Sequence, residues 1–376
     1  MLLVSDRLKK GKAMKRKRIR VMQQVLNPSS YGGVSTEFRA LEKSQLNDEF
    51  EFIPLILKDF HAGLNLKDIM FYYRQIKREK PEIVQIRGAA IDGLNAEIAA
   101  KMVRGTKILL CVHGMYSDFV YYNPIKHFIA RYIIEPLSFT LADGISCVYK
   151  ECSQRENFKH FQKKIVPFVY NRLPSFKENI KSGRQACRAN YEIPSEAIVG
   201  IFCGRITKEK GLTYLLRAFH LMKESWKDCL HFLIVGEGSY LQEFKEAVNR
   251  YSVLREHVHF TGGQRNVSDI LASADFFVLP SLHENHSIAL LEAVAMELPC
   301  IVTDVGGNKE IIKDRKFGLV IEPYNAHQLE AAITKMCDKQ QRDEFVNNIR
   351  ESKFEEFSNA TVDAQLKSAY VKTLEL

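Results

Sequence analysis

The chain has 376 residues, 46% hydrophobic and 26% charged, with a formal net charge of +9. This length exceeds what one hydrophobic core organises, so we expect two α/β domains, and the composition excludes a disordered or fibrous protein. No apolar run approaches the ~20 residues of a membrane-spanning helix, so we expect membrane contact to be peripheral at most.

The charge is unevenly distributed. Residues 1–190 carry 33 basic and 18 acidic residues, a balance of +15, whereas residues 191–376 carry 21 and 27, a balance of −6. A basic half indicates an acidic partner, and anionic lipid headgroups are favoured over nucleic acid; a solubilising surface is the alternative. Because no aromatic motif interleaves the basic residues, we expect no nucleic acid partner.

Residues 1–18 form a basic extension that does not read as a signal peptide, and either Met1 or Met14 is the start, since the strand pattern opens at Ile19. The eight cysteines are scattered singly, most of them inside apolar runs, without a CxxC pair or a Cys/His cluster at zinc spacing. Such buried, reduced thiols are typical of a cytoplasmic protein, here with a peripheral place on the inner face of the membrane as a further expectation.

From Ile19 onward, short β-branched runs alternate with helical stretches. Strands are predicted at residues 83–86, 108–112 and 144–148, with a helix at 91–103. A helical crossover of this length makes neighbouring strands parallel, so we expect an α/β domain with a parallel sheet.

A second α/β half follows a polar, basic stretch at residues 171–196, which we interpret as the interdomain segment. Strands are then predicted at residues 198–202, 232–235, 258–260, 276–279 and 301–303. Parallel sheets place their ligands outside the carboxyl ends of the strands, so the segments after these strands are the candidate site.

Two post-strand segments suit phosphate groups. Gly32 and Gly33 precede a helix whose N-terminus favours anions, although a plain turn is the alternative. Arg205 and Lys210 lie in a glycine turn after strand 198–202, and two cations a few residues apart suit a diphosphate. The sequence contains no DxD pair to hold Mg²⁺, so we expect no metal ion.

Residues 280–293 contain the most informative constellation: a strand end, a polar loop and a helix predicted to start near Ser287. Glu284 falls in the loop, and Glu292 falls on the helix about a turn and a half inward. Carboxylates placed in this way grip sugar and ribose hydroxyls. The alternatives are an exposed loop acid for Glu284 and a buried salt-bridge partner for Glu292.

In the first half, His113 directly follows the predicted strand 108–112 and is a candidate to hydrogen-bond a sugar hydroxyl; a structural histidine is the alternative. The stretch 113–136 is a candidate for acceptor or membrane contact, with ordinary core and surface aromatics as the alternative. Its aromatic residues include Tyr116, Phe119, Tyr121, Tyr122 and Phe128.

As a set, these segments resemble the retaining nucleotide-sugar glycosyltransferases of family 4, the glycosyl transferases group 1. The resemblance runs from about Ile19 to the C-terminus. Its specific parts are Gly204-Arg205 with Lys210-Gly211, Val235 to Gly238, Phe260 to Gly262, Ala274-Asp275 with Pro280-Ser281, the Glu284-to-Glu292 spacing, and Asp304 to Gly307. It implies the α/β GT-B fold, in which two facing Rossmann-like domains with parallel sheets flank an interdomain cleft.

The resemblance also implies a domain plan. After the basic extension at 1–18, an N-terminal Rossmann-like domain on the acceptor side is expected at 19–180. A C-terminal Rossmann-like domain that binds the nucleotide sugar is expected at 181–356. A C-terminal helix at 357–376 is expected to return to the N-terminal domain.

Site roles follow from the same resemblance. Arg205 and Lys210 are expected to bind the donor diphosphate, and Glu292 the ribose. Glu284 and His113 are the expected catalytic residues, in contact with the transferred sugar near the reacting centre. The remaining donor-binding residues are expected to be Gly32, Gly33, Asn285, His286, Ser287 and Ile288.

The expected activity is that of a retaining, metal-independent hexosyltransferase without a cofactor. The donor is a nucleotide-diphosphate sugar, with a UDP-sugar favoured over a GDP-sugar, and the acceptor is a glycan or lipid-linked glycan of bacterial surface polysaccharide synthesis. Retention is expected to proceed by front-face attack, in which the leaving phosphate takes the acceptor proton and no enzymic nucleophile is required.

Two departures from the family pattern bear on this interpretation. Asn285 replaces the usual glycine after the first glutamate, and Asn171-Arg172-Leu173-Pro174 replaces the common Asn-Gly-Val-Asp. The first is expected to alter the sugar pocket. The rival functions are a nucleotide-sugar epimerase on the same fold and a non-catalytic nucleotide-sugar-binding subunit.

Overall fold

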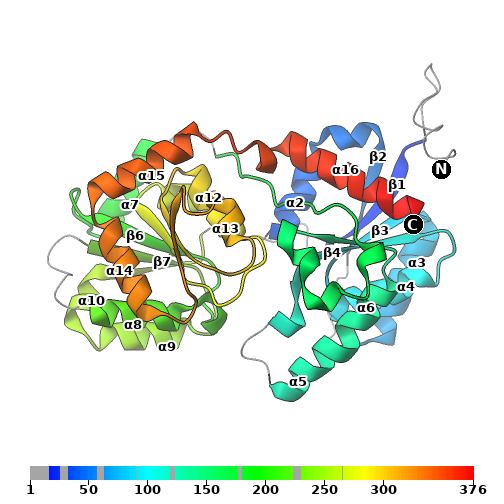
Figure 1. Cartoon of the computed structure of the whole chain (residues 1–376), viewed down its shortest axis with the longest axis horizontal. Coiled ribbons are helices and arrows are strands. Elements are labelled where there is room, and N and C mark those ends of the chain that lie inside the picture. Colours follow the sequence, from blue (N-terminus) through cyan, green and yellow to red (C-terminus); the bar gives the residue numbers. More distant parts are fainter. Residues whose placement is uncertain are drawn as a thin grey trace. The chain divides into compact units, whose positions relative to one another are not determined.

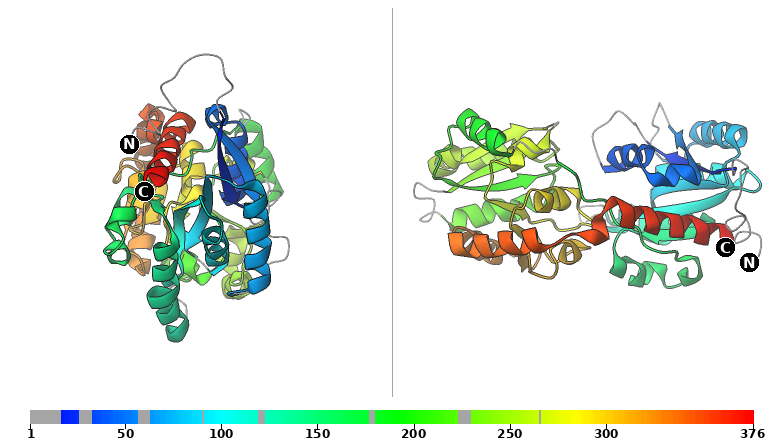
Figure 2. Two further views of the ribbon diagram at one scale, coloured as in Figure 1. Left: turned by 90° about the vertical axis from the view of Figure 1, so that its right-hand side faces the viewer. Right: turned by 90° about the horizontal axis from the view of Figure 1, so that it is seen from above.

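The computed structural model describes residues 17–25, 33–56, 63–89, 91–118, 123–176, 180–222, 230–264 and 266–376. The chain forms two compact units: unit 1 comprises residues 1–172 and 355–376, and unit 2 comprises residues 173–354. These divisions fall at 172/173 and 354/355, where the sequence predicted boundaries at 180/181 and 356/357. Both units are α/β, with helices on both faces of a parallel sheet (Figure 2).

Unit 1 is built on a five-stranded parallel sheet of order β2-β1-β3-β4-β5. Its strands are β1 (Ile19–Gln24), β2 (Phe50–Leu55), β3 (Ile83–Ala89), β4 (Lys107–Met115) and β5 (Gly144–Cys147). Its helices are α2 (Gly33–Glu42), α3 (Leu66–Glu79), α4 (Ile91–Lys101), α5 (Pro124–Ile129), α6 (Glu135–Leu141) and α16 (Asn359–Glu375), with a π-helical turn η3 (Ala130–Ile134) joining α5 to α6. The three strands and the helix predicted in this half are present, although β4 runs beyond the predicted end at Val112.

The C-terminal helix α16 is part of unit 1, where the family resemblance implied a returning helix (Figure 1). Leu366, Ala369 and Tyr370 of this helix join the apolar core that includes Val21 and Phe50. The fully buried Tyr370 hydroxyl donates to Gln85 Oε1 at 2.5 Å and accepts from Gln23 Nε2 at 3.0 Å. The last helix of the chain therefore completes the core of the first unit.

Unit 2 is built on a six-stranded parallel sheet of order β11-β10-β9-β6-β7-β8. Its strands are β6 (Ile198–Cys203), β7 (Leu230–Val235), β8 (Val258–Gly262), β9 (Phe276–Leu279), β10 (Cys300–Thr303) and β11 (Gly318–Ile321). Its helices are α7 (Ile180–Asn190), α8 (Leu212–Leu221), α9 (Leu241–Asn249), α10 (Ser252–His257), α11 (Val267–Leu271), α12 (Ile288–Ala295), α13 (Asn308–Ile311), α14 (Ala326–Met336) and α15 (Lys339–Glu351). All five strands predicted in this half are confirmed.

The prediction that residues 171–196 form only an interdomain segment is wrong, because this stretch contains α7 of unit 2. The helix carries few apolar residues and is held instead by ion pairs. Arg184 and Arg188 each bind one oxygen of Asp275, at 2.8 and 2.9 Å, and Arg188 also donates to the Ser273 carbonyl oxygen at 3.0 Å. A helix anchored by charge leaves no apolar periodicity in the sequence.

The described parts of the chain bear on two further expectations. Seven of the eight cysteines fall in them, all are free thiols, and six are buried, as the sequence predicted. Within the same parts, no helix is both long enough and apolar enough to cross a membrane.

A cluster of three histidines in unit 2 is expected to lower the free energy of unfolding in acid. The His231 and His259 rings approach at 3.0 Å, beside His257. Burial, and then the neighbouring imidazoles, lower the pKa of His231 to about 4. Unfolded histidine titrates near ~6.5, so the unfolded state binds more protons and stability falls as the pH drops from about 6.5 towards 4. We expect urea unfolding to show that His231→Phe removes about 2 kcal/mol of the loss between pH 7 and pH 5. An unchanged loss in that variant would assign the acid sensitivity to other groups.

Candidate active site

The candidate donor site lies at one edge of the unit 2 sheet. Because all strands of this sheet are parallel, the segments that follow β6, β7, β9 and β10 lie at the same edge. The chain builds the sheet in one direction from β6 to β8 and in the other from β9 to β11, so the order reverses between β6 and β9. Ligands bind at such a reversal, which here is flanked by residues 204–211 and 280–287.

These two segments touch through their backbones. Leu282 N donates to the Glu209 carbonyl oxygen at 2.8 Å. Gly211 has φ +71°, and a Cβ at this position would lie 1.7 Å from the Pro280 carbonyl oxygen. The segment after β10 joins them, since Gly307 N donates to the Asn285 carbonyl oxygen at 2.6 Å. The three post-strand segments therefore form one packed layer.

Glu284 and Lys210 meet in this layer. Lys210 Nζ lies 2.6 Å from Glu284 Oε1, and Ser281 Oγ donates to the same oxygen at 2.8 Å. The side chains are 18% and 9% exposed, so both charges are largely removed from water. The predicted diphosphate ligand and the predicted sugar ligand thus form an ion pair, which holds one carboxylate oxygen and leaves Oε2 outside the pair.

The residues after Glu284 lead into α12. Ser287 is the N-cap, and its Oγ accepts from Leu290 N at 3.3 Å, which confirms the predicted helix start. Ile288 is the first helical residue. Burial lowers the pKa of His286 to about 3, so this histidine is neutral at physiological pH. Asn285 Nδ2 is 3.1 Å from His283 Nε2, while its buried Oδ1 has no hydrogen-bond partner among the described residues.

Glu292 lies on α12, one and a half turns from the cap, as the sequence predicted. Burial raises the pKa of Glu292 to about 7. Its carboxyl group also contributes, after burial, to raising the pKa of Cys203 to about 12, which places it near the end of β6. A half-buried carboxylate beside the switch in strand order is positioned to accept hydrogen bonds from vicinal hydroxyls.

Glu292→Gln is expected to stabilise the protein while weakening donor binding. Because the pKa of Glu292 in the folded state exceeds its unfolded value of about 4.5, stability falls as the pH rises from about 4.5 to 7. We expect the variant to gain about 1–3 kcal/mol of unfolding free energy at pH 8 and little at pH 5, measured by urea denaturation. Its affinity for a nucleoside diphosphate should fall at least about tenfold by calorimetry.

The exposed Glu297, which follows the same helix and pairs with Arg350, supplies the control Glu297→Gln. This control should change neither the free energy of unfolding nor the affinity for a nucleoside diphosphate. An equal gain for Glu292→Gln at both pH values would contradict the titration argument.

Arg205 is exposed, and its guanidinium forms no ion pair with any described residue. It lies on the same segment as Lys210, after β6. A guanidinium with open donors can meet a phosphate in bidentate fashion. Of the two predicted diphosphate ligands, Lys210 is therefore engaged with Glu284, and Arg205 is available at the surface.

His113 lies in unit 1, inside β4 rather than after it. The prediction that the strand ends at Val112 is wrong, because β4 resumes pairing with β3 beyond a bulge and continues to Met115. Arg87 from β3 places Nη1 3.4 Å from His113 Nε2, and its Nη2 donates to Gln23 Oε1 at 3.2 Å. His113 thus lies within a polar cluster of unit 1.

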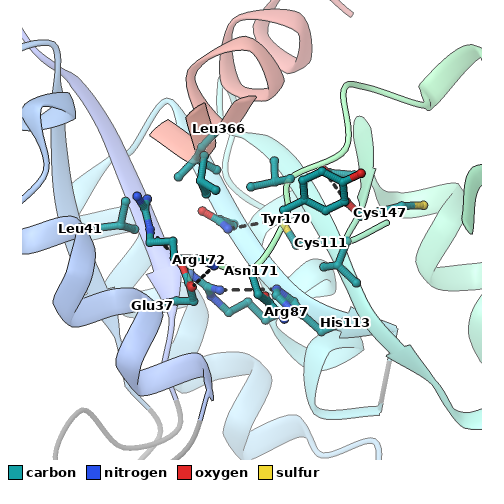
Figure 3. A pocket seen from close by; sticks show the side chains of 15 residues that line it. Glu37, Leu41, Arg87, Cys111, His113, Cys147, Tyr170, Asn171, Arg172 and Leu366 are labelled. Carbon is teal, nitrogen blue, oxygen red and sulfur yellow. Dashed lines mark hydrogen bonds and ion pairs between the residues drawn. The ribbon is translucent and has the colours of Figure 1, made fainter. Parts of the chain in front are cut away.

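This cluster lines a cavity of about 20 Å³, which has room for one water molecule. Figure 3 shows Arg87 and His113 facing it from β3 and β4, with Asn171 and Arg172 beside them. Arg172 is anchored by Glu37 at 3.2 Å and Asp363 at 2.7 Å. The sequence analysis missed Arg87, although a charge at the end of an apolar strand was a signal for it.

Of the two glycines predicted to bind donor phosphates in unit 1, the structure describes Gly33. Gly32 lies outside the described residues, and Gly33 is the first residue of α2. Their predicted contact with the donor phosphates stays a prediction.

Part of the chain matches a family of known proteins. Residues 183–352 match the family described as Glycosyl transferases group 1. The chain is similar to UDP-Gal:alpha-D-GlcNAc-diphosphoundecaprenol alpha-1,3-galactosyltransferase of Escherichia coli, at 23% identity over 292 residues that cover 76% of this chain and 74% of that protein. It is also similar to N-acetyl-alpha-D-glucosaminyl L-malate synthase of Bacillus anthracis, at 25% identity over 300 residues that cover 79% and 76%.

The fold also matches solved structures. The crystal structure of Anabaena Alr3699/HepE in complex with UDP and glucose superimposes with a TM-score of 0.73 at 14% sequence identity, covering 94% of this chain and 100% of that one. At this identity the likeness supports the GT-B fold and no more.

Proposed function

We propose that this chain, which belongs to the glycosyl transferases group 1 family through residues 183–352, transfers a sugar with retention of configuration at the anomeric carbon. It is a glycosyltransferase, as are the relatives that it resembles. The transfer is proposed to proceed without a metal ion. The proposed donor is a nucleotide-diphosphate sugar, with UDP-sugars favoured over GDP-sugars. The proposed acceptor is a glycan or lipid-linked glycan of bacterial surface polysaccharide synthesis. No cofactor is part of the proposal.

One observation carries the proposal: unit 2 brings two cations and two carboxylates to the switch point of a parallel sheet. Lys210 pairs with Glu284 at 2.6 Å, Arg205 is exposed on the same segment, and Glu292 lies on the adjoining helix. A nucleotide sugar presents groups of matching chemistry, namely a diphosphate for the cations and hydroxyls for the carboxylates.

Each group has a proposed part in the reaction. Arg205 and Lys210 stabilise the charge that develops on the departing diphosphate, which replaces the work of a metal ion. Glu292 accepts hydrogen bonds from the ribose hydroxyls. Glu284 accepts them from the transferred sugar through the oxygen outside its ion pair. His113 of unit 1 is proposed to contact the transferred sugar.

Retention is proposed to proceed on one face of the sugar. The bond between the anomeric carbon and the phosphate oxygen breaks, the acceptor oxygen attacks from the same side, and its proton passes to the leaving phosphate. In this scheme the acceptor oxygen itself attacks the anomeric carbon, so no covalent intermediate with the enzyme forms. The carboxylate of Glu284 is paired with Lys210 and is not assigned the role of a nucleophile.

The location is also proposed. Buried free thiols suit a reducing cytoplasm, and the excess of basic residues in the first half suits an anionic inner membrane face, where a lipid-linked acceptor is found. The E. coli relative acts on a diphosphoundecaprenol-linked sugar by its name.

Release of nucleoside diphosphate from a panel of UDP-, GDP- and ADP-sugars tests the function. We expect one donor to react, the release to persist in EDTA, and the Glu284→Ala variant to lose it. Loss of the wild-type release in EDTA would refute metal independence. If no donor reacts, even with a membrane extract as acceptor, the epimerase or the non-catalytic subunit becomes the better description.

A further inference from the structure

The helical stretch formed by α5, η3 and α6 presents its apolar face to solvent. Six large apolar side chains between 40% and 69% exposed lie on this face, and we call them the apolar ridge: Ile125, Phe128, Ile129, Tyr132, Ile133 and Leu137. Their spacing is that of one helical face. They are six of the fifteen exposed large apolar side chains in the described residues, gathered on one stretch of unit 1.

The opposite face of this stretch points into the protein and buries the polar Glu135 and Ser138 together with Ala130 and Phe139. Glu135 is fully buried and accepts from Ser117 N at 2.7 Å, Ser117 Oγ at 2.9 Å and Asn157 Nδ2 at 3.1 Å. One turn further on, the buried Ser138 donates to Glu97 Oε1 at 2.7 Å. A surface helix of a globular protein normally keeps its charged groups outside and its large apolar side chains inside, whereas this stretch buries a carboxylate and exposes six large apolar side chains.

Hydrogen bonds fix this orientation along the stretch. His127 Nε2 lies 2.9 Å from the Ser117 carbonyl oxygen, and Arg131 pairs with Glu156 at 3.3 Å. Rolling the helix to bury the ridge would break these contacts and leave the buried carboxylate of Glu135 without its hydrogen-bond donors, which is strongly unfavourable. The exposure of the ridge is therefore built into the fold.

The ridge also projects from its unit. In Figure 1 and in the left-hand view of Figure 2, α5 lies at the end of the stretch away from the unit 1 sheet. The ring of Phe128 on α5 and the ring of Tyr132 on η3 have centroids 4.8 Å apart and are tilted by 42°. A projecting aromatic and aliphatic surface of this kind is suited to entering an interface.

The charged residues near the ridge favour an anionic partner. On residues 123–141, Lys126 is exposed, Arg131 is partly exposed, and the one carboxylate, Glu135, is buried. The following segment contacts the buried face of the stretch through Asn157, and it carries exposed Lys159 and Lys163 as well as exposed Glu156, the partner of Arg131. Residues 123–164 together hold seven basic and four acidic residues. The accessible charged side chains on the stretch itself are therefore the basic Lys126 and Arg131, which we call the cationic border of the ridge.

From this geometry we propose that the apolar ridge inserts into an anionic phospholipid membrane and is the element that docks this chain on it. Anionic headgroups match the cationic border, and the acyl boundary accepts the ridge. A second copy is less suitable, because a symmetric contact through the same face would oppose two cationic borders. Membrane docking would bring a lipid-linked acceptor to the enzyme, and this role rests on the proposed function.

Vesicle flotation of the full chain tests the proposal. The ridge variant is Ile125→Ser/Phe128→Ser/Ile133→Ser, and the control is Leu64→Ser/Leu66→Ser, which removes two equally exposed side chains elsewhere in unit 1. With vesicles of phosphatidylglycerol and phosphatidylcholine, we expect the ridge variant to lose at least about tenfold in partition coefficient and the control less than about twofold. Pure phosphatidylcholine vesicles and 0.5 M salt should each weaken wild-type binding about tenfold.

Equal flotation of wild type and ridge variant, or no flotation of either, would overturn the proposal. So would sedimentation of the wild type as a dimer that the ridge variant dissociates, which would assign the face to a second copy. Nucleoside diphosphate release is measured in parallel on each variant without vesicles. If the ridge variant still releases nucleoside diphosphate but no longer floats with the vesicles, the result supports membrane docking through the apolar ridge. If the wild type floats normally but releases no nucleoside diphosphate, the result counts only against the proposed reaction.

Discussion

Lys210→Met is expected to lower turnover of the donor by a factor on the order of 10²–10³. Lys210 is the cation held in place at the switch point, 2.6 Å from Glu284, and we propose that it meets the leaving diphosphate. The methionine side chain has a similar length without the charge, so the loss reports electrostatics more than packing. The measurement is kcat for nucleoside diphosphate release, together with the urea unfolding curve.

The unfolding curve separates the two roles of this ion pair. Lys210→Met leaves Glu284 largely buried without its cation, and we expect a loss of about 2–3 kcal/mol. The double variant Lys210→Met/Glu284→Gln removes both charges and should regain most of that stability while remaining inactive. A double variant that regains activity would contradict the proposed roles.

Lys208→Met is the matched control. Lys208 lies two residues earlier on the same segment, is half-exposed, and pairs with Glu243 at 3.1 Å. Its removal should change turnover less than about twofold, because an exposed pair contributes little. An equal loss in both lysine variants would mean that the general positive potential of the segment, rather than Lys210, supports the reaction.

Five of the six strands of unit 2, and the segments that follow them, were predictable because their sequence signals are local, whereas β11 was not predicted. Strands β6, β7, β9 and β10 are largely apolar runs, and a parallel sheet sends all its carboxyl ends to one edge. Glu284 and Lys210 were therefore expected at one site although 74 residues separate them. Their direct ion pair was not predictable, since it depends on the contact of Leu282 with Glu209 and on the close approach of Gly211 to Pro280.

Other features lacked a local signal. Helix α7 is held by Arg184 and Arg188 on a distant Asp275, and strand β2 is an edge strand that contains Pro54, a residue depleted from strands. For the apolar ridge, the sequence does not indicate which face of the helix is buried. Its residues have the helical period, but this period is the same whether the face is buried or exposed. Only the buried contacts of Glu135 show which face points inward.

Gly211→Ala is expected to destabilise unit 2 by about 3 kcal/mol or more. Gly211 ends the short helical turn at Lys208–Lys210 with φ +71°, and an added Cβ would lie 1.7 Å from the Pro280 carbonyl oxygen. The obstacle is backbone, so no side-chain rotation relieves it. The segment must shift away from β9, and Lys210 and Glu284 must separate. Thermal unfolding should show the loss, and kcat at a temperature where the variant remains folded should fall as well.

Gly262→Ala separates the backbone strain from the clash. Gly262 has φ +70°, nearly the same conformation, but a Cβ there meets no atom within 4 Å. An L-residue in this conformation costs about 1–2 kcal/mol, which both variants share. The difference between them therefore measures the close approach of the two segments, and the loss of turnover should appear only in Gly211→Ala. Equal destabilisation by both substitutions would mean that the segments separate freely, and the packed layer would not be what positions Lys210 against Glu284.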